Sequence, residues 1–98
     1  MKKLRFKDEG EFSKLFQEKS PEIAMAIMEG IKEALMYQKK SADLFELEFE
    51  GHDFVYDITL PKSDWKVALE HCKEKFRLWE MADEAIDAHL LIKEIDLW

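Results

Sequence analysis

The stretch from Asp43 to Leu60 reads DLFELEFEGHDFVYDITL and predicts a two-stranded β-hairpin. Apolar and acidic residues alternate over 45–50, and successive strand side chains point to opposite faces, so one face is apolar and the other acidic. A two-residue turn at Gly51-His52, with Gly at the first central position, would set the register of the strands. The predicted pairs are Phe49–Phe54, Leu47–Tyr56 and Phe45–Ile58. All three pairs lie on the apolar face, which unrelated patterns would not guarantee.

The other face of the hairpin gathers carboxylates: Glu46, Glu48, Glu50, Asp53 and Asp57. Glu46 would lie directly opposite Asp57, and like charges in that position destabilise a sheet by up to about 1 kcal/mol. Two interpretations stay open. In one, residues 2–7 (KKLRFK) form a third strand whose alternating cations neutralise the acids. In the other, the face is free and docks a basic partner or a cation. Both could hold if the strand neutralises only part of the face.

Helix signals occupy the segment between the basic strand and the hairpin. Residues 11–18 are expected to form a short helix with Phe12, Leu15 and Phe16 on one side. Ser20-Pro21-Glu22 is a strong start signal for a longer helix that reaches about Lys40. Its predicted apolar stripe consists of Ala24, Ile27, Met28, Ile31, Ala34 and Leu35. Gly30 within this helix indicates close packing against a neighbouring element.

The segment after the hairpin predicts a pair of helices. Ser63-Asp64 is expected to cap the first, in which large side chains recur every three or four residues and form a core seam. These side chains are Trp65, Leu69, Cys72, Phe76 and Trp79. The last segment, from about Asp83 as its cap, carries Ile86, Leu90 and Ile92 among alanines. One continuous helix over 63–95 is the alternative, but we favour two antiparallel helices because a single one would extend beyond a small core.

Together these elements predict one α+β domain over residues 1–98. A small three-stranded, mostly antiparallel sheet, made of the N-terminal strand and the 43–60 hairpin, would be packed on one face by helices and followed by a helical hairpin. The formal net charge of −7 disfavours direct binding to nucleic acid through phosphate contacts. No apolar segment approaches the roughly 20 residues of a membrane span, and Cys72 is the only cysteine. We therefore expect a cytoplasmic protein without membrane contact.

Residues that could carry chemistry are few. Cys72, His52, His71 and His89 lack the spacing of metal ligands, and the three glycines are too widely separated for a phosphate loop. We therefore assign no catalytic, cofactor-binding or metal-binding residue and expect no enzymatic activity. A small metal-dependent enzyme is kept only as the third hypothesis.

A second acidic cluster, Glu80, Asp83, Glu84 and Asp87, precedes the C-terminal residue Trp98. With the hairpin acids, these residues are the predicted partner-binding set. The first hypothesis is a protein-binding module that docks a basic surface of another protein, since acids steer association and aromatic residues anchor it. The alternative is a self-associating structural protein, a homodimer formed through the aromatic-rich C-terminal region or a sheet edge.

The segment 57–98 resembles short uncharacterised proteins of large tailed phages, mainly in ITLPKSDWKVALEHC and in DEAIDAHLLIKEI with the terminal Trp. The resemblance brings no activity, ligand or site residue with it. It implies a small viral or regulatory protein that binds and modulates a host factor in the host cytoplasm.

Overall fold

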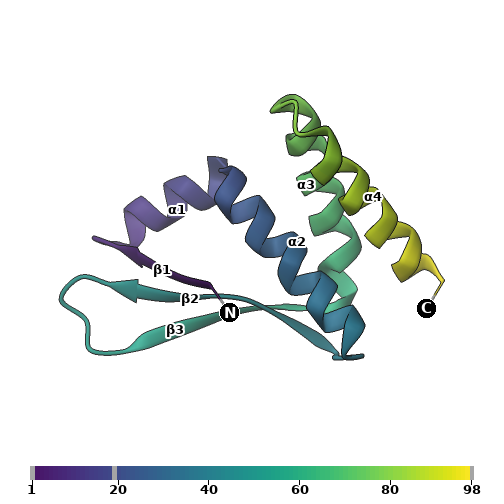
Figure 1. The fold of residues 1–98 in the computed structure, drawn as a ribbon. Coiled ribbons are helices and arrows are strands. Elements are labelled where there is room, and N and C mark those ends of the chain that lie inside the picture. Colours follow the sequence, from purple (N-terminus) through teal and green to yellow (C-terminus); the bar gives the residue numbers. More distant parts are fainter. Residues whose placement is uncertain (1, 19, 98) are drawn as a thin grey trace.

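The computed structural model describes residues 2–18 and 20–97, and the side chains of all of these except residues 2 and 15–18. The helices pack on one face of a three-stranded sheet, and the chain ends in a helical hairpin beside it (Figure 1). This confirms the predicted α+β fold. The elements are β1 (Lys2–Phe6), α1 (Glu9–Glu18), α2 (Pro21–Met36), β2 (Ser41–Phe49), β3 (Val55–Pro61), α3 (Trp65–Leu78) and α4 (Ala82–Asp96). No helix among the described residues is long and apolar enough to cross a membrane.

The sheet has the order β1-β2-β3 and is mixed. β2 and β3 are antiparallel, with the predicted pairs Leu47–Tyr56, Phe45–Ile58 and Glu46–Asp57. β1 lies beside β2 as predicted but runs parallel to it, so the sheet is not mostly antiparallel. The reason is the connection: α1 and α2 carry the chain back along the sheet before β2 begins, as a parallel pair requires.

The hairpin loop is longer than the predicted two-residue turn. The backbone N–H of His52 donates to the carbonyl of Phe49 at 3.1 Å, so the turn centres on Glu50 and Gly51. Gly51 has φ +83°, the conformation that the third residue of a type II turn requires, and is therefore the second central residue, not the first. Phe54 lies in the loop before β3, so the predicted Phe49–Phe54 pair is not part of the ladder.

The core forms where α2 meets the central strand β2. Every residue of the predicted α2 stripe is buried, as are Phe45, Leu47 and Phe49 on the helix-facing side of β2. Phe12 of α1 packs on this core, with its ring centroid 5.4 Å from that of Phe6. The side chains of Leu15 and Phe16, also expected there, lie outside the described residues.

Gly30 lets α2 approach β2 closely. A Cβ atom at this position would lie 2.7 Å from the carbonyl oxygen of Asp43 and 3.0 Å from Cδ2 of Leu44. The Leu44 region carries a register shift between Asp43 and Phe45, so β2 is irregular where the helix crosses it. The expectation that Gly30 marks close packing is confirmed.

We predict that Gly30→Ala lowers the free energy of unfolding by roughly 2 kcal/mol. The added methyl group meets backbone that must move, which costs about 3 kcal/mol, the upper end for overpacking. The higher helix propensity of alanine offsets about 1 kcal/mol of this cost. Urea denaturation followed by circular dichroism measures the difference. Glu33→Ala, an exposed position on the same helix, should change stability by no more than about 0.5 kcal/mol. Equal stability of Gly30→Ala and wild type would contradict the close approach.

Two helices end in left-handed residues that are not glycine. α2 stops at Met36 instead of Lys40: Gln38 has φ +53°, and the N–H of Lys39 donates to the carbonyl of Ala34 at 2.8 Å. α3 ends at Leu78 in the same way: Glu80 has φ +58°, and the N–H of Met81 donates to the carbonyl of Phe76 at 2.8 Å. Both are Schellman motifs. The second one separates α3 from α4, so the prediction of two helices is confirmed.

The predicted caps of the helical hairpin are confirmed only in part. Asp64 occupies the N-cap position of α3 as expected, but it ends a 3-10 turn (Lys62–Asp64) and has no described side-chain capping bond. Met81 occupies the N-cap position of α4, where Asp83 was expected. Ile86 and Leu90 are each 57% exposed. α4 instead turns its small residues inward, and its buried positions are Ala85, Ala88, Leu91 and Ile92. The predicted α3 seam is confirmed: Trp65, Leu69, Cys72 and Phe76 are fully buried, and Trp79 is half-buried.

We predict that Glu80→Gly raises the free energy of unfolding by roughly 1 kcal/mol, because glycine adopts a positive φ without the steric cost of a Cβ atom. Thermal and urea denaturation measure the gain. Glu74→Gly is the matched control: Glu74 is exposed inside α3, where glycine should cost about 1 kcal/mol. The left-handed assignment of residue 80 would be wrong if both substitutions destabilised the protein alike.

Candidate functional site

The acidic face of the hairpin is partly neutralised from within the chain. β1 places Lys3 beside Glu46 and Arg5 beside Glu48, and the Nζ atom of Lys3 lies 3.1 Å from Oε1 of Glu48. The hydrogen bond to Glu48 and its negative charge raise the pKa of Lys3 above 10.5. Because the ion pair favours the charged form of Lys3, it stabilises the folded state at neutral pH. This stabilisation is lost as the pH rises through the raised pKa of Lys3. The first interpretation of the acidic face is therefore confirmed for this part.

The remaining hairpin acids are exposed, although the backbone N–H of Glu50 donates to the carbonyl of Phe6 in β1 at 2.9 Å. Glu50 and Asp53 are exposed in the loop, and Asp57 is exposed on β3, directly opposite Glu46 as predicted. Lys7, expected in the basic strand, follows its end, and its backbone N–H donates to Oε2 of Glu11 at 3.1 Å. This part of the face thus stays accessible to solvent.

The C-terminal acids occupy the other end of the molecule. Glu80 lies in the α3–α4 turn, and Asp83 and Glu84 lie in the first turn of α4. The hairpin loop is at the opposite end of the molecule from α4, so the two predicted acidic clusters do not form one surface (Figure 1). Trp98, the last predicted partner-binding residue, lies outside the described residues.

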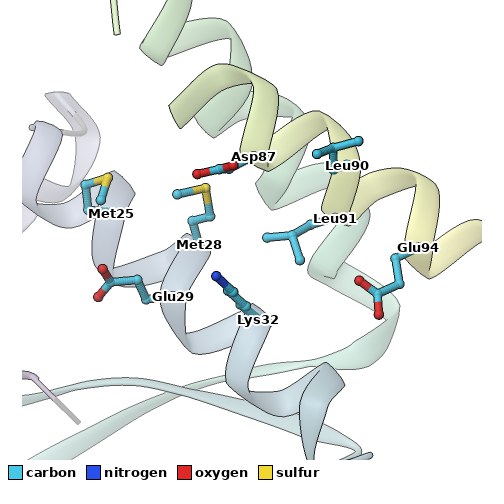
Figure 2. Close-up of a pocket in the computed structure, with 8 residues that line it drawn as sticks. All are labelled: Met25, Met28, Glu29, Lys32, Asp87, Leu90, Leu91 and Glu94. Carbon is cyan, nitrogen blue, oxygen red and sulfur yellow. The ribbon is translucent and has the colours of Figure 1, made fainter. Parts of the chain in front are cut away.

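A hollow of about 280 Å³ lies between α2 and α4, and we call it the α2/α4 groove. Figure 2 shows Met28 of α2 directed toward Asp87 of α4, while Met25 lies farther from α4 on the same helix. The groove is lined by Met25, Met28, Glu29 and Lys32 of α2 and by Asp87, Leu90, Leu91 and Glu94 of α4. Of the predicted partner-binding residues, only Asp87 belongs to this lining.

The groove combines an apolar lining with an acidic rim. Met25 is half-buried, Met28 and Leu91 are buried, and Leu90 is exposed, so thioether and leucine groups border the hollow. Three carboxylates and one lysine give the lining a formal charge of −2. Among the described residues, no ion pair involves Glu29, Asp87 or Glu94. Of the described residues in the lining, Lys32 is the one that is cationic.

Sequence reasoning missed most of this lining for a physical reason. Met25, Met28, Glu29 and Lys32 recur with the spacing of one helical face, and Asp83, Asp87, Leu90 and Glu94 do the same on α4. Each stripe is visible in the sequence, but the periodicity of one helix does not tell which other helix lies opposite. Ala85 and Ala88, the small buried residues of α4, were the one remaining sign in the sequence that this helix packs closely against its neighbours.

A second groove, between α3 and α4, has the opposite charge. Lys73, Arg77 and His89 border an apolar hollow of about 400 Å³ formed by Ala82, Ala85 and Ile86. The Nζ atom of Lys73 lies 3.0 Å from Nδ1 of His89, within hydrogen-bond distance.

Cysteine and histidine residues are dispersed over the molecule. Cys72 is buried in the α3 seam, and its thiol donates to the carbonyl of Ala24 at 3.8 Å. His52 is exposed in the hairpin loop, and His89 borders the α3/α4 groove. Within the described ranges, no three His, Cys, Asp or Glu side chains are placed to share a metal ion.

In comparisons with protein-family models, curated proteins and solved structures, nothing matches this chain. Its function therefore has to be inferred from its own surfaces.

Proposed function

We propose that this protein is a non-enzymatic binding module whose α2/α4 groove takes a basic, amphipathic helical segment of another protein. One observation carries the proposal: methionine and leucine side chains line a hollow whose rim holds Glu29, Asp87 and Glu94. Laying an amphipathic helix into an apolar groove is a recurring mode of peptide recognition. If the resemblance to phage proteins holds, the partner is a host protein in the host cytoplasm.

The groove has room for side chains of a partner helix. Its volume of about 280 Å³ is at the lower limit of the roughly 300–1,000 Å³ that is usual for small-molecule pockets. One or two aliphatic side chains of a partner helix would fill it. Met25 and Met28 suit this role because the unbranched, polarizable thioether adapts its shape to different apolar side chains.

The charge of the rim favours lysine or arginine beside those apolar anchors. Glu29 comes from α2, whereas Asp87 and Glu94 come from α4, so the carboxylates stand on both walls of the groove. Cations spaced one or two turns apart on a partner helix could reach both walls. Such pairs accelerate association and select the partner, and salt screens them.

The hairpin acids are a weaker docking surface. Lys3 and Arg5 lie beside Glu46 and Glu48, so a basic partner would meet cations as well as acids there. Arg5 also lines the small hollow next to Asp53. In the groove, three carboxylates and a set of apolar side chains line one hollow together with a single lysine.

We predict that a synthetic leucine–lysine amphipathic peptide of about 14 residues, roughly four helical turns, binds the protein. Replacing Asp87 and Glu94 together by lysine should weaken binding about tenfold or more, since two attractive contacts become repulsive. Fluorescence anisotropy of the labelled peptide, at low and at moderate salt, measures the affinity. Binding to wild type should weaken with salt.

Glu50→Lys with Asp53→Lys is the charge-matched control. It changes the net charge by the same amount, at exposed loop positions at the other end of the molecule. This variant should keep the affinity of wild type if the groove is the site. The proposal fails if the two double variants lose affinity equally, or if a leucine–glutamate peptide of the same pattern binds as tightly.

A further inference from the structure

The two edges of the sheet are protected very differently. β1, at one edge, carries three cationic residues among its five: Lys2, Lys3 and Arg5. β3, at the other edge, has seven residues and neither lysine nor arginine. Cations on an edge strand discourage pairing with another chain, and an edge without them presents unpaired backbone N–H and C=O groups to any partner strand. Figure 1 shows β3 at the open edge of the sheet.

Apolar side chains gather on this unprotected edge. Phe54 is 56% exposed, Val55 43% and Tyr56 40%. The ring centroid of Tyr56 lies 5.2 Å from that of Phe54 and 5.8 Å from that of Phe49, so an aromatic row leads from the core to the edge. Beside the row is a hollow of about 290 Å³ between α1 and β3, to which Phe12 and Ile58 also contribute. The helices thus leave the β3 side of the sheet open.

We propose that a second copy of this chain covers the edge by pairing β3 with its own β3 in antiparallel orientation. A two-fold axis perpendicular to the sheet relates the copies, so both helical layers lie on one face of a continuous six-stranded sheet. The axis passes through Tyr56. Tyr56 then faces Tyr56 of the partner subunit, and Phe54 faces Ile58 of the partner subunit.

Two features of the edge favour this register over its neighbours. With the axis at Asp57, two carboxylates would face each other, which is unfavourable. With the axis at Tyr56, Asp57 faces Val55 of the partner subunit, and no two acids of β3 are opposite. The carbonyl of Leu60 already accepts a 2.7 Å hydrogen bond from Nε1 of Trp65. With the axis at Tyr56, the pairing of the two copies ends before Leu60 and does not need this carbonyl.

The size of the edge sets the expected strength of pairing. In this register residues 54–58 pair with the same five residues of the second copy, a strip roughly 17 Å long at about 3.3 Å per residue. We expect this strip and its aromatic row to bury less than the roughly 800 Å² per partner of a standard stable interface. The dimer is therefore a reversible one that forms at micromolar or higher concentrations. The α2/α4 groove remains open in it, so this dimer does not depend on the proposed function.

Sedimentation velocity over a concentration series tests the proposal, with wild type compared against Tyr56→Lys. The variant puts two ammonium groups opposite each other at the axis and should weaken the dimer at least about tenfold. Tyr37→Lys is the matched control: Tyr37 is the chain's other tyrosine, is 65% exposed at the end of α2, and lies off the β3 edge. This control should dimerise as wild type does.

Hydrogen exchange on the unmodified protein gives a second, independent readout should Tyr56→Lys fail to fold. Amides within residues 54–58 should gain protection as the concentration rises through the dimerisation range, and amides of α4 should not. The proposal is overturned by a wild type that stays monomeric at millimolar concentration, by a dimer that survives in folded Tyr56→Lys, or by dimerisation without added protection in β3. Leucine–lysine peptide binding that persists in Tyr56→Lys separates this surface from the groove.

Discussion

The seating of α2 on β2 is the constraint on which the rest of the structure depends. Gly30 permits the backbone of the helix to come within contact distance of the Asp43 carbonyl, and the neighbouring isoleucines and alanines fill the space on both sides. The opposite side of the same helix receives α3 and α4, and the thiol of Cys72 reaches the Ala24 carbonyl there. α2 is thus packed between the sheet and the helical hairpin, and the position of the groove follows from that arrangement.

Charge is distributed to match this layering. The sheet balances part of its own acidity, because β1 contributes cations where β2 contributes glutamates. On the helical side, α4 separates two grooves of opposite sign: carboxylates and Lys32 line one, and Lys73, Arg77 and His89 border the other. The net charge of −7 is therefore the sum of locally acidic and locally basic surfaces. The proposed binding role rests on the acidic α2/α4 groove and not on the overall acidity.

The sequence predicts the fold well where local patterns have one physical meaning. Alternation predicted the pairing of Leu47 with Tyr56, and the Ser20-Pro21 signal predicted the start of α2, where the backbone N–H of Ile23 donates to Ser20 Oγ at 3.4 Å. The sequence does not predict the two helix ends at which Gln38 and Glu80 adopt the left-handed conformation, because glycine is the residue that usually occupies such positions. The groove was also out of reach, because it arises from two stripes that only tertiary packing brings together.

The most direct test of the central claim is a map of where a basic amphipathic peptide touches the protein. In ¹⁵N-labelled protein titrated with the leucine–lysine peptide, the account predicts that amide shifts change along one face of α2, near Met25, Met28 and Lys32, and along α4 from Asp87 to Glu94. Changes concentrated in the hairpin loop over 50–57, with the α2/α4 groove unaffected, would contradict it.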